Sequence, residues 1–517
     1  MTSIAVIEPG PTGGPGAMGA VLVLEALRRA GHIATHLRLF GPSRRETSIP
    51  GVLFGGGIID ARSDELGHDA LFVSTIYTRQ WIHLPAALEA CGVRPMREER
   101  TSSDPLVAIG GQMMLAPSPI TPFADVVALG DGEVTAVRIA DMIHAGVPKD
   151  EIRATLSGQP GYWVPGLDEP PSTLRRAEVS TIPVRLLRTG ASGSPTIELA
   201  RGCKSRCAFC PIGWAGGSYR EADKTEVADI VQSARGTGLN AYAPDYSSLS
   251  WVDDLESTMT TASCHPRGRD ARMDATRRLV SRGGQQAGKT WSFGLEGISE
   301  RLRRAIGKPL RNNQIVEGMT ELAQAGCKGV KWYFILGLPG EDESDLQELL
   351  AVLDETRKVW TSRLDLTLTL LQPVPHTPLQ WDDGHFSEAA YDRGMAIRRH
   401  LAAAHSADGL IWIASQPKSR SLHEHDTALS RADASAAGYL TALAGRKSRI
   451  SDGRWTETAD AAGWDWRGAL PAITPGAAVP WSFVDVGVDQ GRVLAARRRY
   501  GETMAASTAG VGESMGV

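Results

Sequence analysis

Short apolar runs alternate with amphipathic stretches along the first 145 residues. The runs with the length and composition of buried strands are Ile4–Glu8, His36–Phe40, Ala70–Thr75, Leu106–Gly110 and Val126–Leu129. Residues Ala20–Ala30 follow a helical pattern. Strands that alternate with helices favour a parallel, doubly wound sheet. We therefore predict an α/β domain of Rossmann type over residues 1–145.

Small residues follow several of these predicted strands. They are Ser74, Thr75, Gly110, Gly111, Gly130 and Gly132. Ligands of doubly wound sheets bind at the carboxyl ends of the strands, so these residues are candidates for a cofactor site. The run Gly14–Gly19 also matches a dinucleotide fingerprint, but no acid ends the next strand, as that fingerprint requires.

A second alternating block begins near residue 196, after a connector rich in Pro and Gly over 146–195. Its predicted strands are Thr196–Ala200, Asn240–Ala243, Ala271–Met273, Trp291–Leu295, Val330–Leu336 and Leu364–Leu370. Six such units predict a partial (β/α)6 barrel over 196–385, with its active site at the carboxyl ends of the strands. We expect a mixed helical and irregular C-terminal domain over 386–504 and a disordered tail over 505–517.

The composition is that of an ordinary globular chain, with 42% hydrophobic residues, 22% charged residues and a net charge of -4. The balanced charge argues against a large nucleic acid as the main partner. No apolar run of about eighteen residues predicts a membrane span. The start of the chain resembles a strand rather than a signal peptide, and its few cysteines fit a reducing compartment. We therefore expect a cytoplasmic protein.

Three of the six cysteines lie within eight residues, at Cys203, Cys207 and Cys210. Thiolates at this spacing can bind three irons of a [4Fe–4S] cluster and leave the fourth iron open. A structural zinc site is the alternative, and it requires a fourth Cys or His at a matching spacing. The other cysteines, including Cys264 and Cys327, are isolated in the sequence.

Further candidates lie near the ends of the barrel strands. Phe209 stands beside the last cysteine of the motif, where an aromatic ring can shield a cluster. Glu296 ends a strand and suits ribose hydroxyls or an α-amino group, although an acid at a helix N-terminus is common without such a role. Arg272 suits a carboxylate, although its place among the basic residues of 267–278 favours an exposed arginine without such a role.

The loop Gly337–Glu341, with the sequence Gly-Leu-Pro-Gly-Glu, closes the fifth predicted strand. Gly337, Pro339 and Gly340 fit the close approach of the backbone to a flat ring, and they equally fit a tight turn. His376 lies between two prolines and is a candidate proton-transfer group, with a simple turn histidine as the alternative.

Together, the cysteine motif, the strand that bears Glu296 and the Gly-Leu-Pro-Gly-Glu loop resemble the radical S-adenosylmethionine (SAM) superfamily. The resemblance implies that Cys203, Cys207 and Cys210 bind the [4Fe–4S] cluster. It also implies that SAM binds the open iron, with Phe209, Glu296 and the loop on the nucleoside side. Members of that superfamily split SAM to a 5′-deoxyadenosyl radical by one-electron reduction.

The N-terminal block resembles the cobalamin-binding domain of one branch of this superfamily, a branch of largely unassigned activity. The resemblance rests on residues 108–112 and 124–133, and weaker similarity extends over nearly the whole chain. The Asp-x-His-x-x-Gly loop of enzymes that ligate cobalt through histidine is absent.

This resemblance implies an enzyme that functionalises an unactivated C–H bond, with cobalamin-dependent methyl transfer as the first hypothesis. A rearrangement, cyclisation or sulfur insertion without cobalamin is the second, and a non-catalytic iron–sulfur sensor is the third. The expected partners are a small-molecule, peptide or RNA substrate and an electron donor such as flavodoxin or ferredoxin.

Overall fold

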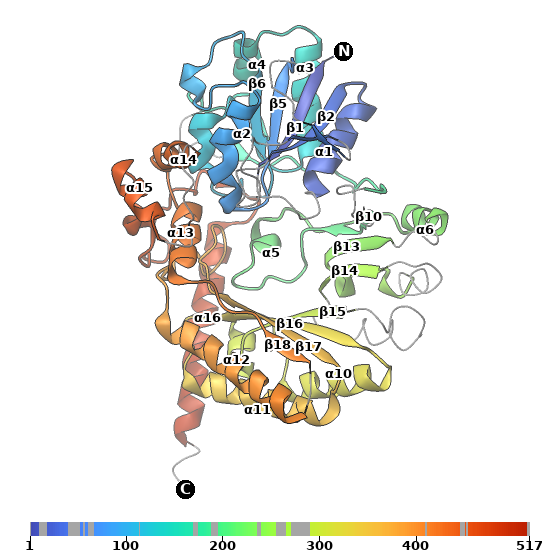
Figure 1. Ribbon diagram of the computed structural model, residues 1–517, viewed down its shortest axis with the longest axis vertical. Helices are drawn as coiled ribbons and strands as arrows, with labels where there is room; N and C mark the ends of the chain where they lie inside the picture. Colours follow the sequence, from blue (N-terminus) through green and yellow to red (C-terminus); the bar gives the residue numbers. More distant parts are fainter. Residues whose placement is uncertain are drawn as a thin grey trace.

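The computed structural model contains an N-terminal sheet, a partial barrel and a group of C-terminal helices (Figure 1). The structure describes residues 2–9, 18–39, 52–54, 57–59, 67–112, 114–168, 174–187, 195–234, 239–254, 265–269, 290–408, 411–444, 450 and 453–513. Arg272 and residues 14–17 of the glycine-rich run lie outside the described residues.

The N-terminal sheet has eight strands in the order β4-β3-β2-β1-β5-β6-β7-β8. The strands are β1 (Ser3–Pro9), β2 (Ile33–Leu39), β3 (Val52–Phe54), β4 (Gly57–Ile59), β5 (Ala70–Ser74), β6 (Leu106–Gly110), β7 (Val126–Ala128) and β8 (Tyr162–Trp163). Strands β2, β1, β5, β6 and β7 are parallel, which confirms the doubly wound prediction. Because the chain leaves β1 towards β2 and then returns to β5, the crevice between β1 and β5 is the expected ligand position.

Helices cover both faces of this sheet. They are α1 (Met18–Arg29), the short 3-10 helices η2 (Thr78–His83), η3 (Arg97–Glu99) and η4 (Ser118–Phe123), and α2 (Leu84–Ala90), α3 (Gly132–His144) and α4 (Lys149–Leu156). Helix α1 buries Ala20, Leu24 and Leu27, which repeat at helical spacing against the buried strand β1.

The barrel strands form two parallel ladders. One ladder contains β10 (Thr196–Glu198), β13 (Asn240–Asp245) and β14 (His265–Arg269), and the other contains β15 (Thr290–Glu296), β16 (Gly329–Leu336), β17 (Arg363–Leu370) and β18 (Trp412–Ala414). The third strand therefore lies before the predicted Ala271–Met273, which falls outside the described residues. Strand β18 adds a seventh strand beyond residue 385, where we expected the barrel to end.

Several shorter elements complete the barrel. They are β11 (Ala200–Arg201), β12 (Arg220–Glu221), α5 (Pro211–Ala215), α6 (Lys224–Ser233), η5 (Tyr246–Ser248), α9 (Glu300–Ala305), α10 (Asn312–Gln324), α11 (Glu343–Val359) and α12 (Glu388–Asp408). Strands β16 and β17 alternate buried and less buried side chains, as expected for strands covered mainly on one face.

The C-terminal residues are divided between the other two parts instead of forming a domain over 386–504. Their elements are α13 (Arg420–Ser430), α14 (Ala436–Ala444), α15 (Trp455–Ala461), η8 (Arg467–Ala469), β19 (Val484–Asp485) and α16 (Gln490–Glu513). Helix α14 packs on η2, α2 and η4 of the N-terminal part, and its Tyr439 shares a buried core with Trp81. Helix α16 packs on α9 of the barrel instead.

Two other boundaries also differ from the prediction. The expected linker over 146–195 contains α4 and β8, and β8 pairs with β7 in the N-terminal sheet. A short strand β9 (Leu174–Arg175) pairs with β19. The predicted tail over 505–517 is helical up to Glu513, because these residues form the end of α16, whose preceding turns bury Tyr500 and Met504. No helix among the described residues is long and apolar enough to cross a membrane.

Candidate functional site

The cysteine loop connects β11 to α5 and lies between the N-terminal sheet and the β15–β18 ladder (Figure 1). The Ala208 N–H donates to the Ile306 carbonyl at 2.9 Å, and the Ala208 carbonyl accepts from the Leu379 N–H at 3.2 Å. Trp214 Nε1 donates to the Cys207 carbonyl at 3.0 Å. The segments that follow β15 and β17 thus fix this loop at the carboxyl ends of the barrel strands.

None of the three thiols forms a disulfide, and they are close enough to perturb one another electrostatically. Cys207 is buried, whereas Cys203 and Cys210 are half-buried. Burial raises the pKa of the Cys207 thiol to about 12, with further upward contributions from Cys210, Glu296 and Cys203 and an opposing one from Lys308. Burial likewise raises the pKa of Cys203. Cys203 and Cys207 are therefore protonated at neutral pH without a metal, and metal binding must displace these two protons.

No group of three or more His, Cys, Asp or Glu side chains in the part of the chain that the structure describes is arranged around a single metal ion. The three thiols thus lack the compact arrangement of a mononuclear zinc site. A cubane cluster has a different requirement, because each thiolate binds a different iron.

Glu296 and Lys308 form a charged pair beside the cysteine loop. The Lys308 Nζ lies 3.8 Å from Glu296 Oε1, and the Glu296 residue is only 2% exposed. Glu296 adopts a φ of 68°, and the register of β15 against β16 shifts between Gly294 and Glu296. A residue other than glycine in this left-handed region costs about 1 kcal/mol or more, and such strain clusters at functional sites. Phe209 packs against the barrel core.

The Gly337–Glu341 loop is shaped by its own carboxylate. Glu341 Oε2 accepts from the Gly337 N–H at 2.9 Å and from the Leu338 N–H at 3.3 Å. Glu341 Oε1 binds Arg393 Nε at 2.7 Å, and burial raises the pKa of this carboxyl. Glu341 therefore stabilises the conformation of the turn. Gly337 and Gly340 adopt left-handed φ values of 79° and 84°.

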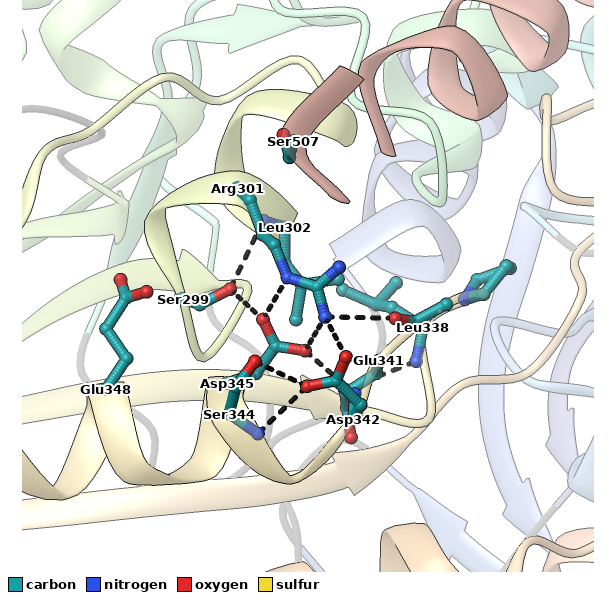
Figure 2. Close-up of polar contacts among 12 residues, drawn as sticks. Ser299, Arg301, Leu302, Leu338, Glu341, Asp342, Ser344, Asp345, Glu348 and Ser507 are labelled. Atoms are coloured by element: carbon teal, nitrogen blue, oxygen red, sulfur yellow. Dashed lines mark hydrogen bonds and ion pairs between the residues drawn. The ribbon is translucent and has the colours of Figure 1, made fainter. Parts of the chain in front are cut away.

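Figure 2 shows how this loop is tied to the helix that follows Glu296. Arg301 of α9 donates to both carboxylate oxygens of Asp345, at 2.7 and 2.6 Å, and to the Gly340 carbonyl at 3.1 Å. Asp345 also accepts from the Ser299 hydroxyl, which caps α9. Tyr500 of α16 donates to the Pro339 carbonyl at 2.8 Å. The two strand-end motifs of the sequence are thus held as one unit.

In the N-terminal sheet, the glycines near the carboxyl ends of the strands are packed against protein. Ser74 pairs with Gly110 in the sheet, and the Thr75 N–H donates to the Gly110 carbonyl at 2.9 Å. A Cβ on Gly111, whose φ is +120°, would lie 2.1 Å from the Thr75 carbonyl oxygen. The backbone itself therefore requires glycine at this position.

The loop after β7 follows the same rule. A Cβ on Gly130 would lie 2.0 Å from the Ala177 carbonyl oxygen, and one on Gly132 would lie 2.5 Å from Val23. Between these glycines, Asp131 forms ion pairs with Arg201 and Arg220. This loop therefore contacts the residues that lead into the cysteine loop.

His376 is enclosed at the joint between the barrel and the N-terminal sheet. Its Nε2 binds the Leu115 carbonyl at 2.8 Å, the residue is 0% exposed and its φ is 62°. Burial lowers its pKa to about 4, so the ring is neutral at neutral pH. This environment favours the turn histidine over the proton-transfer group.

The sequence prediction missed Lys308, Asp245 and Arg201. Lys308 follows the turn at Gly307, and this turn carries no recognisable pattern. Asp245 ends β13 and perturbs Cys203 electrostatically, so an acid at a strand end was an available signal. Arg201 stands two residues before Cys203, and only the fold shows its acidic partners.

Comparison with known sequences agrees with this arrangement. Residues 62–165 match the model of the N-terminal region of radical SAM proteins, and residues 263–353 match the model of the Radical SAM superfamily. The chain carries a radical SAM domain. The second match contains Glu296 and the Gly337–Glu341 loop, whereas the cysteine loop precedes it.

Two curated relatives are similar to parts of this chain. The uncharacterized protein MJ0966 of Methanocaldococcus jannaschii is 26% identical over 202 residues, which cover 38% of this chain and 44% of the relative. The ribosomal protein uS12 methylthiotransferase RimO of Desulforudis audaxviator is 24% identical over 254 residues, which cover 44% and 49%. The chain therefore spans less than half the length of the curated relatives it matches.

Among solved structures, the cobalamin-dependent S-adenosylmethionine radical enzyme OxsB with aqua-cobalamin bound is similar at a TM-score of 0.48 and 13% sequence identity. The alignment covers 71% of this chain and 53% of that chain.

Proposed function

We propose that this chain is a radical SAM enzyme that cleaves SAM reductively at a [4Fe–4S] cluster held by Cys203, Cys207 and Cys210. The observation that carries the proposal is the position of the three mutually coupled thiols on one anchored loop, beside the strained Glu296 and Lys308. A non-catalytic iron–sulfur sensor needs neither of these charged residues.

The donor set fits the cluster. Three thiols on one loop match three irons and leave the fourth iron for SAM. When bound, the reduced cluster supplies the electron that splits SAM to the 5′-deoxyadenosyl radical. The chain's own contribution is binding, orientation and the exclusion of water around the reacting atoms.

Glu296 and Lys308 have charges suited to the two ends of an amino acid zwitterion. In this proposal, Glu296 accepts hydrogen bonds from the α-amino group or the ribose hydroxyls. Lys308 donates to a carboxylate oxygen. The left-handed backbone at Glu296 fixes the direction of its carboxylate before SAM binds, which lowers the cost of ordering the site.

The finer proposal is cobalamin-dependent methyl transfer to an unactivated carbon. Its support is the direction in which the N-terminal sheet faces. Loops from the carboxyl ends of β6 and β7 contact the barrel through the His376–Leu115 and Arg201–Asp131 contacts. A ligand in the crevice between β1 and β5 lies at this same edge, and therefore on the side of the cluster loop.

A cobalamin-independent reaction is the second candidate. It is favoured by the packing of Gly111 and Gly130 against the chain's own backbone, which suits a domain that serves as scaffold. For either reaction, we propose a small-molecule, peptide or RNA substrate and an electron donor of the flavodoxin or ferredoxin type.

Anaerobic reconstitution with iron, sulfide and SAM tests the proposal. We expect the reduced protein to form 5′-deoxyadenosine, and Cys207→Ala to lose both this product and the iron. Cys327→Ala is the matched control, because Cys327 is also a buried free thiol but lies outside the loop. Retention of the full iron content by Cys207→Ala, or the absence of SAM cleavage by the wild type, would contradict the proposal.

Addition of hydroxocobalamin to the same preparation separates the two finer candidates. Binding at micromolar concentration supports methyl transfer. A visible spectrum that remains that of the free corrin, together with active SAM cleavage, supports the scaffold alternative.

A further inference from the structure

Five charged side chains meet where the N-terminal sheet touches the start of the cysteine loop. These residues, which we call the arginine clamp, are Asp131, Glu133, Glu198, Arg201 and Arg220. Each side chain is 11% exposed or less. Asp131 and Glu133 come from the loop after β7 and the start of α3, whereas the other three come from the barrel.

Arg201 is bonded to three carboxylates. Its Nε and Nη2 atoms donate to the two oxygens of Glu198 at 2.9 and 2.8 Å. Its Nη1 lies 3.2 Å from Asp131 Oδ1, and its Nη2 also binds Glu133. Lysine has a single charged nitrogen and cannot reproduce this planar fork. The side chain is therefore specified as arginine by partners in both parts of the molecule.

The position of Arg220 beside Arg201 explains why an acidic residue from the N-terminal part is needed at this junction. It lies directly opposite Arg201 in the antiparallel β11–β12 ladder, where two like charges repel each other. Asp131 relieves this repulsion, because its Oδ2 accepts from Arg220 Nη1 at 2.6 Å while its Oδ1 faces Arg201. Burial would raise the pKa of Asp131, yet the two arginines and the Val179 N–H hold it below its ordinary value.

The connecting segment adds backbone bonds to the same loop. The Asp131 N–H donates to the Ala177 carbonyl at 2.9 Å, and the Val179 N–H donates to Asp131 Oδ2 at 2.8 Å. Arg220 Nη1 donates to the Val179 carbonyl at 2.7 Å. The clamp is therefore built on fixed backbone on both sides of the junction.

We propose that Arg201 is a positioning residue, and that the loop Gly130–Glu133 of the N-terminal sheet fixes the conformation of the cysteine loop through it. Cys203 follows Arg201 by two residues, so a shift of the Arg201 backbone moves the first predicted cluster ligand. The effect on catalysis rests on the proposed function, whereas the effect on the loop does not.

Hydrogen exchange of the metal-free chain over residues 1–517 tests this directly. We expect Arg201→Gln to raise the exchange rates of amides in residues 202–210 by about tenfold or more, because the loop opens locally without its anchor. Glu133→Gln keeps Arg201 and removes one charge from the other side of the junction. We expect it to raise the same rates by about threefold.

Arg100→Gln is the matched control. Arg100 is a buried arginine that pairs with Asp125 inside the N-terminal part, and it does not belong to the clamp. It should leave exchange in residues 202–210 unchanged. Unchanged exchange in Arg201→Gln or in Glu133→Gln would overturn the proposal. If Arg201→Gln does not fold, Glu133→Gln and Arg100→Gln decide the question alone.

Activity measurements separate this proposal from the proposed function. In reconstituted enzyme with equal iron per chain, we expect Arg201→Gln to lower kcat for 5′-deoxyadenosine formation by about tenfold, with a smaller change in KM. If the wild type cleaves no SAM but the cysteine loop of Arg201→Gln exchanges faster, only the proposed function is contradicted. If Arg201→Gln is active and residues 202–210 exchange at the wild-type rates, only the positioning role is contradicted.

Discussion

Glycine-rich loops after parallel strands form both the mouth of the barrel and the carboxyl edge of the N-terminal sheet. The two regions differ in whether these loops present side chains to a ligand site or pack against the chain itself. At the barrel mouth, the strand ends present thiols, Glu296 and Lys308 to one another. At the N-terminal edge, Gly111 and Gly130 are in contact with the chain's own backbone. A glycine-rich loop alone therefore does not identify a ligand site.

The two regions also differ in which residues adopt left-handed backbone. In the N-terminal sheet, glycine occupies such positions and relieves the strain. In the barrel and its exit loops, glycines such as Gly337 and Gly340 also occupy such positions, but so do Glu296 and His376, which are almost fully and fully buried. Strain at a buried polar residue is the stronger indication of a constrained role.

The first prediction concerns the packed glycines. Gly111→Ala should lower the free energy of unfolding by about 4 kcal/mol, because the added Cβ meets the Thr75 carbonyl and the φ is unfavourable. Gly146→Ala, with a φ of +76° and no atom within 4 Å of the added Cβ, should cost about 1 kcal/mol. Urea denaturation followed by tryptophan fluorescence measures both. Equal stability of the two variants would show that Gly111 is not required by packing.

The second prediction concerns His376 at the joint between the two regions. The folded protein holds this ring neutral with a pKa of about 4, whereas an unfolded histidine titrates near its ordinary value of 6.5. Its contribution to stability is therefore complete above pH 6.5 and is lost as the pH falls towards 4. The expected loss is about 3 kcal/mol over this window.

His376→Asn tests this origin, because asparagine tolerates positive φ but does not titrate. The variant should be less stable at pH 7 and should lose less stability between pH 6.5 and pH 4, as measured by urea denaturation at several pH values. An unchanged pH dependence would show that His376 is not responsible.

The third prediction concerns the charged pair at the barrel mouth. Glu296→Gln and Lys308→Met should each lower kcat/KM for SAM cleavage by about a hundredfold, or about 2.7 kcal/mol of transition-state stabilisation. Glu317→Gln on the exposed face of α10 is the control and should have no effect. Full activity of Glu296→Gln would show that the charged pair does not distinguish the barrel mouth, as a ligand site, from the carboxyl edge of the N-terminal sheet.

The smallest predicted effect concerns the support of the Gly337–Glu341 loop. Tyr500→Phe removes the hydrogen bond to the Pro339 carbonyl and should cost about 1 kcal/mol of stability. It should raise KM for SAM only about twofold, since Arg301 still holds the Gly340 carbonyl. Thermal denaturation and initial rates check both numbers. A large fall in kcat would mean that the loop also acts in the cleavage of SAM and not only in its binding.

Local pattern was sufficient for most of the fold. The five parallel strands of the N-terminal sheet and helix α1 lie where the apolar pattern predicts, because burial on both sheet faces or on one helix stripe has a clear sequence period. The short strand β18 and the docking of α14 on the N-terminal core have no such signal. Strand β18 depends on its pairing with β17, as of Trp412 with Leu364, and α14 depends on contacts with η2, α2 and η4, which lie more than 300 residues earlier in the chain.

The candidate site was predictable only where a motif is contiguous. The cysteine spacing and the Gly337–Glu341 loop are each read from a few adjacent residues. The Glu296–Lys308 pair and the contacts of Arg201 with Asp131 and Glu133 arise from the fold. Gly130 and Gly132 show the opposite outcome. Their sequence pattern predicts a ligand-binding loop, but in the structure they pack against Ala177 and Val23 of the same chain.

Mössbauer spectroscopy of the chain reconstituted with iron-57, with and without SAM, tests the central claim most directly. If three cysteines hold the cluster, one of its four irons lacks a protein thiolate, and SAM should change the parameters of that iron alone. A cluster whose four irons are unaffected by SAM, or iron bound equally well by Cys207→Ala, would contradict the account.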